Sequence, residues 1–306
     1  MSWQARMAIL RARLRRDKEF YSNAEYMRHH YPAHQTADHV EPPETAYKAN
    51  EITQTEIDGF PCYTLHPNGP WSGLHIFHLH GGGFVEGAQD HHWHFAAWMV
   101  HHLRCKYSLF MYPLAPQHDH STIVPSTLRA FDHVMSDVPQ RQRILFGDSA
   151  GGSLSLGIAQ ELRDTGQNQP ACIALFSPWL NMAVDHELSA AIEPYDPELG
   201  IEGLKQAGSW YAGDRELNDA ELSPEYADLS GIAPLSIFVG TRDILLPDSI
   251  FLHANARRSG TTSTLNIYYG MFHNWIMQPL PEARKARSEL KAFVRKHAAS
   301  TQRDER

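Results

Sequence analysis

The strongest constraint on the fold is an alternation that begins near residue 45, where short β-rich runs are separated by segments with helical periodicity. Strands are predicted at 46–55, 60–65, 74–80, 107–112, 143–147, 171–177, 235–240 and 264–269. Helices are predicted at 90–103, 122–136, 150–164, 247–259 and 282–297. Such alternation is typical of a mostly parallel, twisted sheet with helices on both faces. The sequence therefore predicts an α/β protein with eight strands.

Two segments do not follow this alternation, residues 1–40 and residues 179–225. The first begins with four apolar residues at helical spacing and arginines mostly on the other faces. The apolar four are Trp3, Met7, Leu10 and Leu14. A basic amphipathic helix can lie on a membrane surface, but an acidic chain without a second anchoring signal favours a helix packed on the protein. We predict one domain over residues 1–306, with the two segments as a helical cap over one edge of the sheet.

The composition suggests that the protein acts on small molecules. A net charge of -8 and a pI near 6.2 give no electrostatic reason to expect nucleic acid or an acidic membrane as a partner. The three cysteines, Cys62, Cys105 and Cys172, lack the spacing of a metal site or redox pair. The sequence shows neither the apolar core of a signal peptide nor a run long enough to cross a bilayer. We therefore expect a cytoplasmic protein.

A nucleophile is predicted between the strand-like "RILF" and the helix that follows it. Residues 147–151 read Gly-Asp-Ser-Ala-Gly, the Gly-x-Ser-x-Gly pattern in the strand–turn–helix context that gives it meaning. In so tight a turn, side chains two positions either side of Ser149 would collide, and Gly147 and Gly151 remove that collision. The turn places the Ser149 hydroxyl at a helix N-terminus, where the backbone favours developing negative charge. A glycine-rich turn with an incidental serine is the alternative.

Three consecutive glycines end the strand-like stretch "LHIFHLHGGGF" at residues 74–84. Each glycine loses backbone entropy on ordering, so the run suggests that the bare backbone itself is needed. A serine that attacks an ester creates an oxyanion, and preorganised N–H donors must hold it. We predict that the N–H groups of Gly82 and Gly83, with that of Ala150, form this oxyanion hole. A flexible hairpin is the other interpretation.

These motifs make the chain resemble the α/β-hydrolases of the hormone-sensitive-lipase group, the bacterial esterases with an HGGG motif. The resemblance is carried by residues 80–84, 147–152 and 112–118, the last reading Tyr-Pro-Leu-Ala-Pro-Gln-His. It covers roughly residues 45–298 and implies an α/β-hydrolase fold and a serine esterase that needs no cofactor. Pro113 and Gln117 replace the Arg and Glu usual in the family, which puts in doubt the polar bracing of that loop.

The catalytic acid and base must follow the serine, in the order Ser, Asp or Glu, His. His273 comes one short loop after the last predicted strand and is the candidate base. Asp243 stands directly at the end of the preceding strand and resembles the triad acid of the family. Asp248, a few residues on, is the alternative, although its position suits a helix cap better.

Other residues suggest a pocket rather than a metal site. The histidine-rich stretch 90–102 lacks the cysteine or carboxylate spacing of a zinc site, so no metal is predicted. Five aromatic residues are candidates for lining an apolar pocket, although each of them also suits packing in the core. They are Phe84, Trp179, Trp210, Trp275 and Tyr195, of which the first four are the predicted pocket residues. Bulky rings would leave a tight slot, which predicts acyl groups from acetyl to butyryl.

The sequence thus predicts a carboxylesterase that acts on a small-molecule ester. An amidase or acyltransferase would use the same residues, because leaving group and acceptor depend on pocket shape and water access. A non-catalytic ligand receptor on this fold is a further alternative. A homodimer through the edge strand "TLNIYY" is possible, but a helix can equally cover such an edge.

Overall fold

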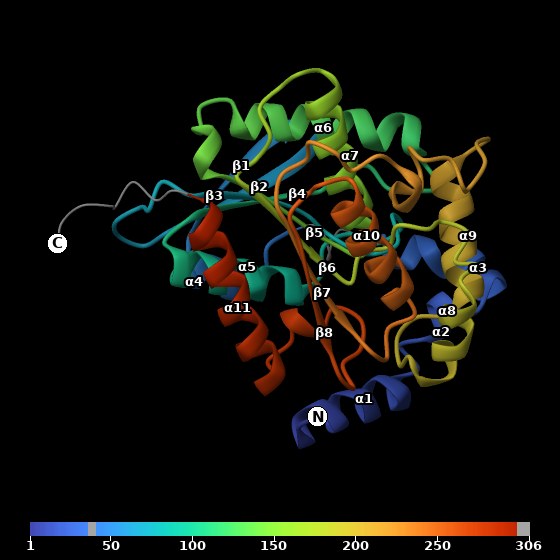
Figure 1. The fold of residues 1–306 in the computed structure, drawn as a ribbon. Coiled ribbons are helices and arrows are strands. Elements are labelled where there is room, and N and C mark those ends of the chain that lie inside the picture. Colours follow the sequence, from blue (N-terminus) through green and yellow to red (C-terminus); the bar gives the residue numbers. More distant parts are fainter. Residues whose placement is uncertain (36–40, 299–306) are drawn as a thin grey trace.

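The computed structural model of the protein describes residues 1–35 and 41–298. Eight strands form one sheet in the order β1-β2-β4-β3-β5-β6-β7-β8 (Figure 1). The strands are β1 (Glu51–Ile57), β2 (Phe60–His66), β3 (His75–Leu79), β4 (Lys106–Phe110), β5 (Arg143–Asp148), β6 (Cys172–Phe176), β7 (Leu235–Gly240) and β8 (Ser263–Tyr268). Strand β2 pairs antiparallel with β1 and β4, and all other pairs are parallel. The predicted eight-stranded, mostly parallel sheet is confirmed.

Helices cover both faces of the sheet (Figure 1). One face packs against α6 (His120–Met135), α7 (Ala150–Asp164) and α10 (Leu246–Arg258), and the other against α5 (Asp90–Leu103) and α11 (Pro281–His297). The remaining helices are α1 (Trp3–Arg15), α2 (Glu19–Ser22), α3 (Ala24–His34), α4 (Glu44–Ala49), α8 (Glu187–Ile192) and α9 (Ile201–Ala212). Of the helices in the described residues, none combines the length and apolar character needed to span a bilayer.

Strand β3 shows why the sheet is buried on both sides. All five of its residues are buried. Phe77 and Leu79 belong to the core on the α6 and α7 face, whereas Ile76 belongs to the core on the α5 and α11 face. Successive side chains in a strand point to opposite faces, so a central parallel strand needs apolar residues at nearly every position.

The prediction of a strand over 46–55 is wrong at its start. Residues Glu44–Ala49 form α4, and β1 begins only at Glu51. Pro43 precedes α4 as its N-cap, and Ala46 and Ala49 are good helix formers. A dense run of β-branched residues, which favours a strand, begins at Ile52.

The first helix forms as predicted but buries a different face. The apolar residues expected to pack on the protein are exposed, Trp3 by 69% and Leu14 by 74%. The small side chains of Ala5 and Ala12, with Ile9 between them, face the core instead. Small residues let α1 approach the rest of the molecule closely, and the hydroxyl of Ser2 hydrogen-bonds Glu282 on α11.

The two segments predicted as a cap lie side by side, with α2 and α3 against α9 (Figure 1). The approach is closest at Gly200 and Gly203, where a Cβ atom would collide with the backbone of Ser22 and Tyr21. Residues 36–40 of the predicted cap and 299–306 of the predicted domain lie outside the described residues. The domain boundary itself stays a prediction from the sequence.

The contact between α9 and α2 makes a testable prediction. A methyl group at position 203 would overlap the Tyr21 backbone, so we expect Gly203→Ala to lower the free energy of unfolding by about 1 to 3 kcal/mol. Urea unfolding followed by circular dichroism measures this change.

Gly157→Ala on α7 is the matched control. Position 157 has open space where its Cβ would stand, so alanine there should leave stability unchanged or raise it by about 1 kcal/mol. Equal effects of the two substitutions would contradict the proposed close contact.

Candidate active site

The sheet topology places the candidate site at one position. After β3 the chain moves to β4 on one side and then returns to β5 on the other. Loops that leave adjacent parallel strands in opposite directions open a crevice at the carboxyl ends of those strands. Leu79, the last residue of β3, pairs with Gly147 of β5, so the three glycines and the predicted nucleophile leave the sheet next to each other.

Ser149 lies in a strained turn between β5 and α7. Its backbone has φ 50° and ψ -121°, a region that residues other than glycine rarely adopt. The Ser149 N–H donates to the Phe176 carbonyl of the neighbouring strand at 3.0 Å, which helps to hold the turn. A Cβ at Gly147 would strike the Gly151 backbone, and one at Gly151 would strike the Leu79 carbonyl. Only glycine permits this geometry.

The glycine loop passes beside the turn. A Cβ at Gly81 would stand 3.0 Å from the Ser149 Cβ. Gly82 and Gly83 have φ of 110° and 60°, the left-handed region that favours glycine. Gly82, Gly83 and Ser149 line one cavity of about 1230 Å³. Ala150 is the first residue of α7, so its N–H has no partner within the helix and is free for an oxyanion.

His273 and Asp243 are paired at the ends of β8 and β7. Nδ1 of His273 lies 3.1 Å from Oδ2 of Asp243, which is fully buried. The other oxygen of Asp243 accepts the Leu245 N–H at 3.0 Å. An imidazole that donates its Nδ1–H to a carboxylate keeps Nε2 free as an acceptor, and His273 lines the same cavity as Ser149. Within the described residues Ser149 and His273 are not hydrogen-bonded, and such contacts often tighten only when substrate binds.

Asp248, the alternative acid, lies elsewhere. One of its oxygens accepts the N–H groups of Leu180 at 2.7 Å and Asn181 at 3.0 Å. It does not cap α10 either, because Leu245 occupies the N-cap position. The carboxylate instead joins the first turn of α10 to the loop after β6.

Asp148 forms a buried network that sequence reasoning missed. One oxygen of its fully buried carboxylate accepts from His78 Nε2 at 2.9 Å. The other accepts from Asn274 Nδ2 at 2.6 Å and from His92 Nε2 at 3.3 Å. Burial raises the pKa of Asp148, but His92 and His78 outweigh it and hold the pKa well below its usual range. The only signal in the sequence is the position of Asp148 directly before Ser149.

The histidines of this network have fixed tautomers. The Tyr107 hydroxyl donates to His78 Nδ1 at 2.6 Å, and the Gln89 N–H donates to His92 Nδ1 at 2.9 Å. Each ring therefore accepts at Nδ1 and presents its Nε2–H to Asp148. These histidines support the nucleophile turn and the glycine loop.

Comparison with known proteins agrees with this geometry. The sequence profile of the α/β-hydrolase fold matches residues 76–277. The chain belongs to the α/β-hydrolase family.

Curated relatives of this α/β-hydrolase are esterases. An esterase of Acinetobacter venetianus is 28% identical over 224 residues, covering 72% of this chain and 74% of the relative. An acetyl-hydrolase of Streptomyces hygroscopicus is 28% identical over 226 residues, covering 73% and 76%. The crystal structure of an esterase from the bacterial hormone-sensitive lipase family superposes with a TM-score of 0.81 at 26% identity, covering 97% of this chain and 99% of that one. The protein is a carboxylic ester hydrolase of this family.

The glycine loop of this hydrolase is braced by the segment 112–118, although Pro113 and Gln117 depart from the family pattern. The Tyr112 hydroxyl donates to the His80 carbonyl at 2.8 Å, and its ring stacks on the imidazole of His80. The Ala115 N–H donates to the Phe84 carbonyl at 2.8 Å. Backbone contacts and Tyr112 thus supply the bracing.

The first helices brace the other side of the glycine loop. Glu86 accepts hydrogen bonds from Tyr21 on α2 and from His34 on α3, each at 2.6 Å. A Cβ atom at Gly83 would stand only 2.9 Å from the Tyr21 ring. The N-terminal segment therefore contacts the predicted oxyanion hole directly.

The prediction that four aromatic residues line the pocket is wrong, because none of them lines the cavity around Ser149. Phe84 is fully buried and stacks on Tyr211, with ring centroids 3.8 Å apart. Trp179 and Trp275 are also core residues, and Trp210 packs against Tyr31. Phe84 and Trp275 follow active-site motifs in the sequence, but the large apolar area of such rings is more stable when it is buried in the core.

Two further carboxyl groups lie behind His273. Asp196 accepts the Ile244 N–H at 2.9 Å, next to Asp243, and the half-buried Glu198 lines the cavity. Burial lowers the pKa of His273, but Asp243, with Glu198 and Asp196 behind it, outweighs burial and raises the pKa to about 9. Burial raises the pKa of Glu198 to about 8.

Because these carboxyl groups raise the pKa of His273, we predict that kcat/KM is highest at alkaline pH. His273 must be neutral to accept a proton, so kcat/KM should rise with pH up to about 9. Replacing Glu198 with glutamine removes a negative charge that stabilises the imidazolium, so the half-maximal pH of Glu198→Gln should move downward. Initial rates with p-nitrophenyl acetate between pH 6 and pH 10, roughly the range in which these groups titrate, measure the shift.

Glu202→Gln provides the control, because Glu202 is an exposed residue of α9 that does not line the cavity. Its pH profile should match that of the unmodified protein. If Glu198→Gln also leaves the half-maximal pH unchanged, Glu198 does not influence the base.

Proposed function

We propose that the protein is a serine carboxylesterase that hydrolyses short-acyl esters through an acyl-enzyme intermediate. The observation that carries the proposal is that Ser149, His273 and the glycine loop share one cavity, with Asp243 paired to the histidine behind them. A nucleophile, a base oriented by a buried carboxylate, and bare amides on one side of a gap are the groups that acyl transfer needs.

In the proposed reaction, His273 Nε2 takes the proton from Ser149 Oγ as the oxygen attacks the ester carbonyl. The N–H groups of Gly82, Gly83 and Ala150 hold the resulting oxyanion, and Asp243 stabilises the imidazolium. The imidazolium then protonates the departing alcohol, which leaves an acyl group on Ser149. Water deprotonated by His273 hydrolyses this ester and restores the serine. No step requires a cofactor.

The residues that line the cavity favour a preference for short acyl groups. The reason differs from the one given by the sequence, which was a tight slot between aromatic rings. Charged side chains from several segments of the chain are among the residues that line the cavity, and they include Arg11, Arg15, Asp17, Glu86, Asp90, Glu198 and Arg287. A long alkyl chain laid across them would displace water without replacing its hydrogen bonds, which is unfavourable. An acetyl or butyryl group leaves most of this wall hydrated. The acetyl-hydrolase among the relatives is consistent with this substrate class.

Replacing the nucleophile tests the mechanism. We expect Ser149→Ala to lower kcat for p-nitrophenyl acetate by about 10⁴- to 10⁶-fold, because no hydroxyl remains to form the acyl-enzyme. Circular dichroism should show an unchanged fold. Ser136→Ala, at the exposed C-terminal end of α6, should retain full activity. Turnover by Ser149→Ala close to that of the control would refute the proposal.

A series of p-nitrophenyl esters tests the acyl preference. We expect kcat/KM to be highest for acetate to butyrate and to fall by about tenfold toward octanoate, because the charged wall does not favour a longer chain. Rates that keep rising beyond about eight carbons would show that an apolar channel accepts the chain.

A further inference from the structure

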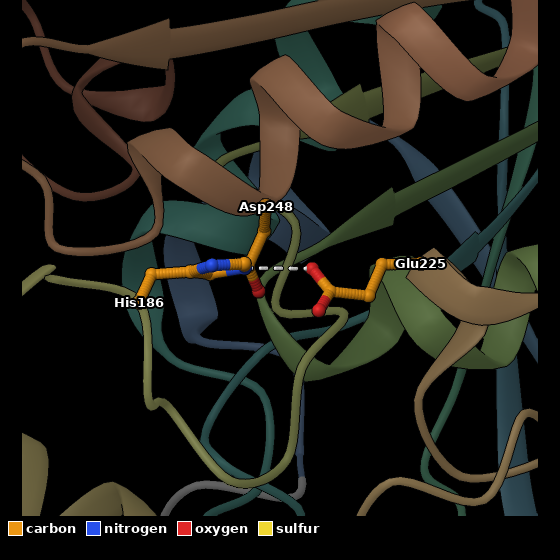
Figure 2. A group of neighbouring side chains, drawn as sticks. All are labelled: His186, Glu225 and Asp248. Carbon is orange, nitrogen blue, oxygen red and sulfur yellow. Dashed lines mark hydrogen bonds and ion pairs between the residues drawn. The ribbon is translucent and has the colours of Figure 1, made fainter. Parts of the chain in front are cut away.

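Three side chains from distant parts of the sequence converge beside the N-terminal end of α10 (Figure 2). His186 precedes α8, Glu225 lies in the 3₁₀ helix η4 (Pro224–Tyr226), and Asp248 belongs to the first turn of α10. One ligand atom from each residue lies within 4.8 Å of the others. In the part of the chain that the structure describes, this is the only such group of three metal-ligating side chains.

The distances within the group fit a small metal ion. His186 Nε2 lies 2.9 Å from Oε2 of Glu225 and 3.9 Å from Oδ1 of Asp248. A tetrahedral Zn²⁺ site with metal–ligand distances near 2.0 to 2.1 Å separates its ligand atoms by about 3.3 Å. The observed separations lie on either side of that value. Small side-chain rotations would therefore bring all three atoms to bonding distance of one ion.

One oxygen of each carboxyl group lacks the hydrogen-bond partner that burial normally demands. Oδ1 of Asp248 and Oε1 of Glu225 are buried without a hydrogen-bond partner. The side chains themselves are only 1% and 2% exposed. A buried polar atom without a partner requires an explanation, and a bound ion is one of the arrangements that provides it.

His186 is held in place and reachable from solvent. Its ring stacks on Phe251 of α10, with centroids 4.7 Å apart and planes 11° apart. The stacking fixes the plane in which Nε2 points toward the carboxylates, as Figure 2 shows. The side chain remains 16% exposed, which leaves a path by which an ion can enter.

We propose that His186, Glu225 and Asp248 bind a divalent transition-metal ion, preferentially Zn²⁺, with water as the fourth ligand. An imidazole with two carboxylates suits Zn²⁺, whereas Mg²⁺ and Ca²⁺ require six or more oxygen ligands. This site is separate from the cavity that contains Ser149, because none of the three residues lines that cavity. The ion would join the loop after β6, η4 and α10, so its role would be to stabilise the fold.

A metal-free explanation makes different predictions. In it, the hydrogen bond between His186 and Glu225 and the two backbone N–H groups that donate to Asp248 satisfy the group. The groups would then be complete without an ion, and added metal would change neither the stability nor the spectrum of the protein. The experiment below separates the two explanations.

Isothermal titration calorimetry of the EDTA-treated full-length protein with ZnCl₂ provides the test. We expect about one equivalent to bind, with a rise in Tm that grows with Zn²⁺ concentration, because the ion binds the folded state. Glu225→Gln keeps the shape of the side chain but weakens the ligand, and His186→Ala removes one. Each variant should lower the affinity by about tenfold or more.

A control variant tests whether other histidines of the chain account for Zn²⁺ binding. His94→Ala removes an exposed histidine of α5 and should leave Zn²⁺ affinity unchanged. In Co²⁺-loaded protein, the absorption bands of tetrahedral coordination should be present and should disappear in Glu225→Gln, even if His186→Ala fails to fold. Failure of the unmodified protein to bind Zn²⁺, or equal affinity in Glu225→Gln, would overturn the proposal. Hydrolysis by Ser149 does not enter this test.

Discussion

The buried carboxylate of Asp148 is the interaction on which the arrangement of the candidate site depends. Its three donors come from β3, from α5 and from the loop after β8. A buried charge that loses a partner costs about 3 to 5 kcal/mol, so all three segments are held to one arrangement. Asp148 precedes the nucleophile and Asn274 follows the base, so their 2.6 Å hydrogen bond sets the position of one reacting group relative to the other.

Much of the fold was predictable because central strands have a strong local signal. The apolar runs of β3, β5, β6 and β7 are bounded by turn residues and buried along nearly their whole length. The weak points were short or amphipathic elements. Residues 46–49 of α4 were predicted as strand, and α1 buries alanines rather than its largest apolar side chains. In both places the outcome depends on what the element packs against, which local periodicity does not encode.

For the candidate site too, some residues could be predicted from the sequence and others could not. Ser149, the glycines, Asp243 and His273 could be predicted because each stands directly after a strand and this fold brings the ends of those strands together. The pocket could not. Glu86, Glu198 and Arg287 come from segments far apart in the sequence, and nothing near them in the sequence marks their shared cavity. Of the four predicted pocket aromatics, Phe84, Trp179 and Trp275 are buried in the core, and none of the four lines the cavity.

The N-terminal helices have one more consequence. Trp3, Met7, Arg15 and Phe20 lie on the cavity wall, whereas the reacting groups stand on the ends of strands. Apart from its buried residues and Tyr21, which touches the glycine loop, this stretch can vary without disturbing the groups that make and break bonds. Laboratory evolution of a new substrate range could therefore randomise the exposed cavity-lining positions within the first twenty residues.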